Sequence, residues 1–215
     1  MTKTYAFDVY GTLIDTHFVA TQLEAWRPGL GQAMSVTWRN KQLEYAFRRG
    51  LMNEYVPFST CTEQALDYTC AAHQTTLSPE QKAQLLDLYL RLPCFDDVQE
   101  SLASLVAKGH RLIAFSNGEQ HSVETLLRRA GIRDEFAQII SCEEVKTFKP
   151  NPSVYQHLLS VTQDNDTHLV SSNPFDVLGA QSAGMKTVWL QRSVDVPFDP
   201  WGVEPDRVIR RLTEL

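Results

Sequence analysis

The sequence predicts an α/β protein with a doubly wound parallel sheet and an all-helical insertion after the first strand. From residue 93 onward, short apolar runs alternate with segments of helical spacing, whereas residues 16–92 show helical spacing alone. Such alternation produces a parallel sheet with helices on both faces. Polar residues also stand where several predicted strands end, as expected for a site at one edge of such a sheet. We therefore expect a core of residues 1–15 and 93–215 and an inserted helical domain of residues 16–92.

The first strand is predicted at residues 4–8, a short apolar run that ends in Asp8. Helical spacing then continues through three stretches of the insertion, at residues 37–55, 62–73 and 78–92. Ser78 is a good N-cap, because Pro79 follows at the first helical position and Gln81 completes a capping box. The insertion is therefore expected to contain helices and almost no strand.

The second half of the chain predicts alternating helices and strands. Helices are expected over residues 98–109, 122–131 and 176–184 and from Asn151 onward, and strands over 110–116, 136–141, 167–172 and 186–190. Three of these helices run up to a glycine, at Gly109, Gly131 and Gly184, and glycine commonly ends helices. Asn151 caps the remaining helix, and Pro152 starts it. The run at 186–190 is expected to be the last strand.

Polar residues from four segments should meet at the carboxyl edge of this sheet. Asp8, Ser116–Asn117 and Ser171–Asn173 end three strands, and Lys149 follows a fourth. Ligands of open α/β sheets bind at this edge, and the helical insertion would cover it as a lid. A carboxylate can act as a nucleophile, forming an ester that water then opens. Lys149 would keep Asp8 ionised, and hydroxyls such as that of Thr12 would donate hydrogen bonds to developing charge.

These segments resemble the four motifs of the haloacid dehalogenase superfamily: DVYGTLID at Asp8, SNG after the second strand, KP at Lys149, and SSNPFD. Within the superfamily, the chain is similar to the L-2-haloacid dehalogenases, whose cap resembles WRNKQLEYAFRRGLMNEYVPF. The resemblance implies a Rossmann-like core with a helical cap. It also implies an enzyme that converts (S)-2-haloalkanoic acids into (R)-2-hydroxyalkanoic acids through an ester on Asp8. The implied partners are the 2-haloacid and halide, with no cofactor, and the implied assembly is a homodimer.

The resemblance also implies two sets of functional residues. The catalytic set is Asp8, Thr12, Arg39, Ser116, Lys149, Tyr155, Ser171, Asn173 and Asp176. The substrate-binding set is Tyr10, Asn40, Leu43, Phe58, Asn117 and Phe175.

Each set carries implied roles. Arg39 and Asn117 would receive the halide beside the ring of Phe175, and Ser116 would hold the substrate carboxylate. Lys149 would position Asp8 and balance its charge, with Tyr155 and Ser171 linked to Lys149 by hydrogen bonds. Asn173 and Asp176 would position or activate the hydrolytic water, while Thr12 supports the Asp8 loop. Tyr10, Leu43 and Phe58 would form the apolar wall of the pocket.

Two residues distinguish this chain from the phosphatases of the superfamily. Phosphatases usually carry a second aspartate two positions after the nucleophile, where Tyr10 stands here, and many place a metal-binding acid where Asn173 stands. Halide leaves as a stable anion and needs neither a proton donor nor a divalent cation. No metal site is therefore predicted. Asn40 and Phe175 stand where familiar members have glutamine and tryptophan, which would leave room for longer acyl chains.

Two other functions remain open at this point: a superfamily phosphatase acting on a small phosphorylated metabolite, and a non-enzymatic relative that binds a small carboxylate. Simpler interpretations of single residues also remain. Arg39 is consistent with a surface pair to Glu44, Tyr155 with core packing, and Asp176 with a favourable position in the helix dipole.

Composition excludes several other classes of protein. A net charge of −6 argues against nucleic-acid binding, and no apolar run approaches the length of a membrane span. The four cysteines form no C-x-x-C pair, and the six histidines lack metal-ligand spacing. Motifs of serine hydrolases, NTPases and dinucleotide-binding proteins are missing. We expect a cytoplasmic protein with reduced thiols and with no membrane or nucleic-acid partner.

Overall fold

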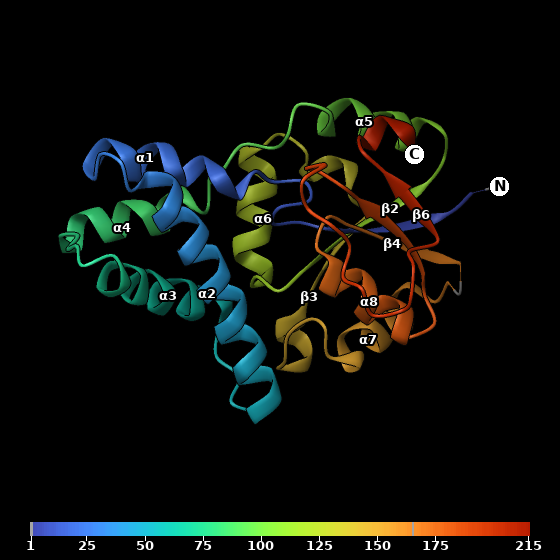
Figure 1. The fold of residues 1–215 in the computed structure, drawn as a ribbon. Coiled ribbons are helices and arrows are strands. Elements are labelled where there is room, and N and C mark those ends of the chain that lie inside the picture. Colours follow the sequence, from blue (N-terminus) through green and yellow to red (C-terminus); the bar gives the residue numbers. More distant parts are fainter. Residues whose placement is uncertain (1, 165) are drawn as a thin grey trace.

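The computed structural model describes residues 2–164 and 166–215, and a six-stranded parallel sheet lies at its centre (Figure 1). The strands are β1 (Thr4–Asp8), β2 (Arg111–Ser116), β3 (Gln138–Ser141), β4 (Thr167–Ser171), β5 (Lys186–Leu190) and β6 (Arg207–Ile209). Their order is β3-β2-β1-β4-β5-β6, so β1 lies between β2 and β4. The strand order reverses at β1, which makes its carboxyl end the expected ligand-binding position of a doubly wound sheet.

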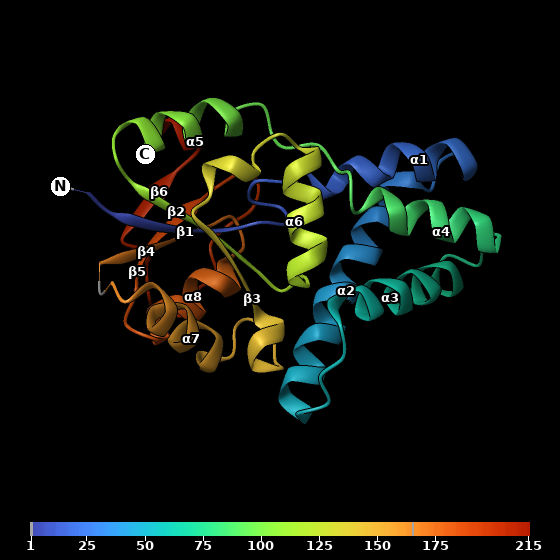
Figure 2. The same cartoon turned by 180° about the vertical axis from the view of Figure 1, so that it is seen from behind.

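Two pairs of helices cover the two faces of this sheet (Figures 1 and 2). They are α5 (Val98–Ala107), α6 (Gln120–Arg129), α7 (Pro152–Thr162) and α8 (Pro174–Ser182). Side chains of β1 alternate between the faces. Tyr5 and Phe7 belong to the apolar cluster that includes α5 and α6, whereas Ala6 belongs to the cluster that includes α7 and α8. Burial on both faces fixes the register of β1 and hence the direction of Asp8.

The remaining helices form a separate layer beyond the carboxyl ends of the strands, which we call the cap (residues 16–92) (Figure 1). They are α1 (Val19–Trp26), α2 (Gly31–Met52), α3 (Phe58–Ala72) and α4 (Pro79–Leu88). Fully buried Trp38 joins two of them, since its indole N–H donates to the Thr62 carbonyl at 2.8 Å. None of the helices in the described part of the chain is long and apolar enough to cross a membrane.

The described part of the chain also contains four short 3-10 helices: η1 (Thr16–Phe18), η2 (Arg133–Glu135), η3 (Cys142–Val145) and η4 (Leu212–Glu214). Two linkers join the cap to the core, and they lie antiparallel to each other. The Asp15 N–H donates to the Pro93 carbonyl at 2.9 Å, and the Phe95 N–H donates to the Leu13 carbonyl at 3.0 Å. This crossing supports domain boundaries near residues 15 and 93, which we retain as a proposal.

The predicted alternation of helices and strands is confirmed. The capping box of α4 is also present, because Ser78 Oγ accepts the Gln81 N–H at 3.2 Å and Gln81 Oε1 accepts the Ser78 N–H at 3.0 Å. Several ends differ by two residues: α6 begins at Gln120 rather than 122, and β3 begins at Gln138 rather than 136.

The bounds of α1, within the predicted helical insertion, and the strand β6 were not predicted, so the run at 186–190 is not the last strand. β6 has three residues, which is too short for an alternating pattern to emerge. It is held by backbone pairing with β5, which continues where the Gln191 N–H donates to the Ile209 carbonyl at 2.8 Å.

Candidate active site

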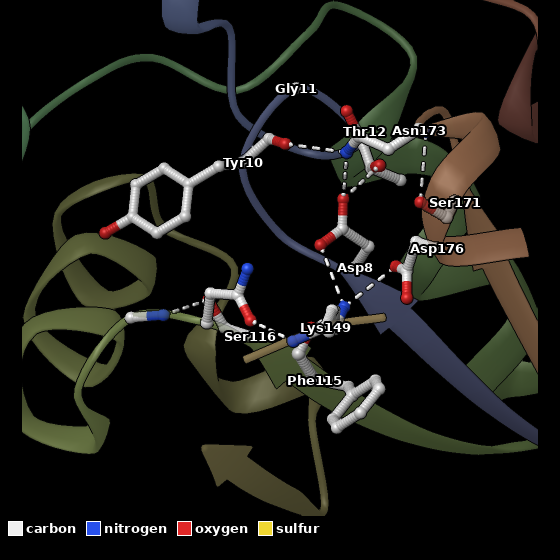
Figure 3. Close-up of polar contacts among 12 residues, drawn as sticks. Asp8, Tyr10, Gly11, Thr12, Phe115, Ser116, Lys149, Ser171, Asn173 and Asp176 are labelled. Carbon is white, nitrogen blue, oxygen red and sulfur yellow. Dashed lines mark hydrogen bonds and ion pairs between the residues drawn. The ribbon is translucent and has the colours of Figure 1, made fainter. Parts of the chain in front are cut away.

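Asp8, at the carboxyl end of β1, is the centre of the candidate active site (Figure 3). It is 7% exposed. The chain reverses directly after it, where Gly11 has a φ of +84°, a conformation that favours glycine. The Gly11 N–H closes the turn by donating to the Ile14 carbonyl at 2.8 Å. The turn returns Thr12 to the Asp8 carboxylate, and Thr12 Oγ1 donates to Asp8 Oδ2 at 2.7 Å.

Lys149 holds the other carboxylate oxygen from the opposite side (Figure 3). Its Nζ lies 3.0 Å from Asp8 Oδ1 and 2.8 Å from Asp176 Oδ2, and it donates to the Phe115 carbonyl at 2.9 Å. These three contacts use all three ammonium protons. Burial alone lowers the pKa of Lys149, but the Asp176 and Asp8 carboxylates more than offset this and leave the pKa above its ordinary value. Lys149 therefore remains charged and balances Asp8.

Asp176, in the first turn of α8, is fully buried behind Lys149. Its Oδ1 accepts the Tyr155 hydroxyl proton at 2.8 Å. Burial raises the pKa of Asp176 even though Lys149 opposes the shift, and burial with the nearby Asp176 raises the pKa of Tyr155. Tyr155 is thus linked to Lys149 by hydrogen bonds through Asp176, because the ammonium protons already have other acceptors. Tyr155 acts on Lys149 through Asp176, and the role of Asp176 toward water stays a prediction.

Asn173, between β4 and α8, contacts the same Asp8 oxygen as Thr12. Asn173 Nδ2 lies 2.7 Å from Asp8 Oδ2 and 3.3 Å from the Tyr10 carbonyl oxygen. Both partners are acceptors, so the amide nitrogen rather than the amide oxygen must face Asp8. Ser171 Oγ accepts the Asn173 N–H at 3.1 Å and so orients this residue. The hydrogen bonds that link Ser171 to Lys149 therefore run through Asn173 and Asp8.

The donors around Asp8 do not fit a divalent metal. Magnesium takes oxygen ligands, whereas Asn173 presents an N–H and Lys149 an ammonium group to the carboxylate. Across residues 2–164 and 166–215, no group of three or more histidine, cysteine, aspartate or glutamate side chains is placed to hold a metal ion. The arrangement instead directs the Asp8 carboxylate through three donors, as a carboxylate nucleophile requires.

Ser116 and Asn117 lie at the end of β2, where the sequence predicted them. Ser116 Oγ accepts the Gly118 N–H at 3.0 Å, and Asn117 Oδ1 accepts the Lys149 N–H at 2.9 Å. Asn117 thus fixes the backbone of Lys149 as well as standing at the strand end. The predicted contacts of both side chains with substrate and halide stay predictions.

Arg39 reaches from α2 of the cap to the core. Its Nη2 donates to the Tyr10 carbonyl at 3.2 Å, and its Nη1 donates to Gln42 Oε1 at 2.7 Å. Glu44 pairs instead with two other cations of α2, so the interpretation of Arg39 as a partner of Glu44 is wrong. Gln42 is buried and was not predicted, although its spacing of three residues from Arg39 on a helix could have indicated the contact.

The ring of Tyr10 lies in an aromatic cluster between core and cap. Its centroid is 6.1 Å from that of Phe58 and 6.3 Å from that of Tyr89, and Phe58 also lies 6.1 Å from Phe148. Tyr10 and Phe58 are buried, in agreement with an apolar wall. Tyr89 and Phe148 were missed, although an aromatic residue directly before the motif lysine was a usable signal.

Three other predicted substrate-binding residues lie on α2 or in the first turn of α8. Asn40 is exposed on α2, and Leu43 is half-buried. Phe175, at the start of α8, packs edge-on against Phe47 of the cap with 5.0 Å between ring centroids. Their contact with substrate stays a prediction.

Known proteins resemble this chain in sequence and in fold. A family profile described as haloacid dehalogenase-like hydrolase matches residues 2–184. An (S)-2-haloacid dehalogenase from Pseudomonas sp. (strain YL) is 40% identical over 212 residues, which cover 98% of this chain and 91% of that protein. Haloacetate dehalogenase H-2 from Moraxella sp. (strain B) is 37% identical, with 94% of this chain and 90% of that protein covered.

Solved structures give the same result. The L-2-haloacid dehalogenase from Xanthobacter autotrophicus with chloropropionic acid covalently bound has a TM-score of 0.92 and 30% sequence identity. The match covers 100% of this chain and 96% of that one. The chain under study is therefore similar to dehalogenases in sequence, in cap and core architecture, and over nearly its full length.

Proposed function

Because the chain belongs to the haloacid dehalogenase-like hydrolases, we propose that it hydrolyses (S)-2-haloalkanoic acids to (R)-2-hydroxyalkanoic acids and halide. The observation that carries this proposal is the environment of Asp8. An ammonium, a hydroxyl and an amide N–H hold the carboxylate, and an aromatic cluster adjoins it where a second acid would serve phosphate chemistry. The similarity to several (S)-2-haloacid dehalogenases over almost the whole chain supports the same reaction.

In the first step, an oxygen of Asp8 attacks C2 of the substrate while the carbon–halogen bond breaks. The halide leaves with the bonding electron pair, and C2 is inverted. Asp8 Oδ2 already accepts hydrogen bonds from Thr12 and Asn173, whereas Oδ1 contacts Lys149, so we assign the attack to Oδ1. Arg39 and Asn117 are the proposed donors to the departing halide.

In the second step, water attacks the carbonyl carbon of the Asp8 ester and releases the hydroxy acid. The bond to C2 is left intact, so the inverted configuration is retained in the product. Asn173 is the residue proposed to orient this water, and the contact of its amide with Asp8 supports this role. Asp176 is the proposed acceptor of the water proton, which requires exchange of its present contact with Lys149 or Tyr155.

The reaction is expected to be indifferent to chelators and specific for one enantiomer. Release of chloride from (S)-2-chloropropionate should be unchanged, within about twofold, after treatment with EDTA, because the donors at Asp8 do not fit a metal. The (R) enantiomer should not be turned over. Ion chromatography of chloride measures both results.

The same preparation should be assayed with p-nitrophenyl phosphate and magnesium. Magnesium-dependent phosphate release without chloride release would overturn the proposal in favour of a phosphatase. Tyr10 and Asn173 count against that alternative, because neither supplies the carboxylate that the metal site of a phosphatase uses.

We also propose that the protein is a cytoplasmic homodimer. All four cysteines are free, which suits a reducing compartment. Leu51 and Met52, at the end of α2, are 85% and 59% exposed, and exposed apolar side chains of this kind favour association. Light scattering should give a mass of two chains, and a mass of one chain would contradict the dimer.

A further inference from the structure

We propose that Arg192 is a positioning residue for Asp8 and acts through the main chain of Thr12. Arg192 follows β5 and contacts the Asp8 loop at the Thr12 carbonyl. None of the sequence motifs includes it. Insofar as it concerns catalysis, this inference rests on the proposed function of Asp8.

The guanidinium of Arg192 donates two hydrogen bonds to one main-chain carbonyl. Its Nε lies 3.1 Å and its Nη2 2.7 Å from the Thr12 carbonyl oxygen. The remaining nitrogen, Nη1, lies 2.8 Å and 2.9 Å from the two carboxylate oxygens of Asp97. The planar guanidinium of arginine can bind the carbonyl and the carboxylate at the same time, in a fixed geometry. A lysine ammonium on a flexible chain does not provide this geometry.

Thr12 connects Arg192 to the proposed nucleophile, Asp8. Its hydroxyl donates to Asp8 Oδ2 at 2.7 Å and accepts the Ser172 N–H at 2.9 Å. The side chain of Thr12 therefore links Asp8, at the end of β1, to Ser172, which follows β4. The main-chain carbonyl of Thr12 is held separately by Arg192. A small rotation of the Thr12 peptide would move the hydroxyl and thereby turn the Asp8 carboxylate.

Arg192 is itself held firmly. Asp97, its partner, is buried at the start of α5, and the Leu212 N–H donates to Asp97 Oδ2 at 2.8 Å. The guanidinium also lies 4.3 Å from the centroid of the Phe95 ring. Phe95 belongs to the linker between core and cap, so the same cluster touches the Asp8 loop, the linker and the C-terminal segment.

A buried ion pair is a weak source of stability, since apolar side chains of similar volume often serve as well. Stability alone therefore gives little reason for a charged fork at this position. Fixation of the Thr12 carbonyl gives a specific reason for a charged residue here. Catalysis depends on the direction of the Asp8 carboxylate and is lost through small displacements.

The inference is tested with Arg192→Lys, measured as chloride release from (S)-2-chloropropionate per folded enzyme. We expect kcat to fall about 10- to 100-fold while KM changes by less than about twofold, because the orientation of Asp8 rather than substrate binding is disturbed. Arg211→Lys is the matched control. Arg211 lies 3.3 Å from Asp96 in an exposed ion pair next to this cluster, and its variant should retain kcat within about twofold.

A second variant and a structure keep the test decisive. Asp97→Asn removes the anchor of Arg192 and should also lower kcat with KM unchanged, even if Arg192→Lys does not fold. Unchanged kcat per folded enzyme in both variants, or a rise in KM alone, would overturn the inference. If the wild-type protein releases no halide, the proposed function fails instead. A crystal structure of Arg192→Lys then decides the inference, since an undisturbed bond between Thr12 and Asp8 would contradict it.

Discussion

Asp8→Asn is expected to lower chloride release from (S)-2-chloropropionate by at least about 10⁴-fold. A neutral amide is a poor nucleophile toward C2, and no ester can form at the carboxylate position. The variant should remain folded, because Asn has nearly the same shape and Asp176 still pairs with Lys149 at 2.8 Å. Initial rates by ion chromatography, together with the melting temperature, check both expectations.

Asp15→Asn is the matched control for this experiment. Asp15 lies on the linker to the cap, and its Oδ1 accepts the His17 N–H at 2.9 Å without contacting the site cluster. The same chemical change there should leave the rate within about twofold. A rate for Asp8→Asn close to that of the wild type would exclude the ester mechanism. Mass spectrometry of quenched wild-type enzyme adds a direct test, since the acyl group should be found on the peptide that contains Asp8.

Much of the fold could be predicted because it is recorded in local patterns. The strand that ends in Asp8 and the box at Ser78 are each specified by a few adjacent residues, and both are confirmed. β6 could not be found in this way. Its three residues carry no period of their own, and its pairing partner lies in β5, so only the folded chain shows that it is a strand.

The site was predicted in the same uneven way. Motif residues at strand ends, such as Asp8 and Lys149, meet as expected because parallel strands deliver their carboxyl ends to one edge. The contacts between these residues could be predicted less well from the sequence. Lys149 uses the carbonyl of Phe115, and Arg39 and Arg192 bind the carbonyls of Tyr10 and Thr12. Main-chain acceptors are the same at every residue, so no sequence pattern indicates them.

The routes by which Tyr155 and Ser171 are linked to Lys149 have a related cause. The sequence does not show how many acceptors already surround the ammonium group. With three acceptors in place, further polar groups bind its neighbours instead: Tyr155 binds Asp176, and Ser171 binds Asn173, which contacts Asp8. Proton count, rather than proximity, decides such a network.

Lys149→Met is expected to lower kcat by about 10²–10³-fold and to destabilise the protein by about 3–5 kcal/mol. Asp8 and Asp176 would lose their shared cation, and Asp176 is fully buried. Burial already raises the pKa of Asp176, and loss of Lys149 should raise it further. A larger fraction of Asp176 should then be protonated at a given pH, and Asp8 should become less well directed. Chemical denaturation and steady-state kinetics measure the two losses.

The sign of the pH dependence distinguishes this cause from a simple packing defect. In the unfolded chain an aspartate has a pKa of about 3.9, and in the folded variant the pKa of Asp176 is higher. At a pH between these two pKa values, the folded variant binds more protons than the unfolded chain. Stability of Lys149→Met should therefore fall as pH rises through this window, and the deficit against wild type should be smaller at pH 5 than at pH 8. Lys146→Met, at an exposed lysine nearby, should show neither the deficit nor its pH dependence. A deficit that is equal at both pH values would assign the loss to packing, and Asp176 would then not depend on Lys149 for its charge.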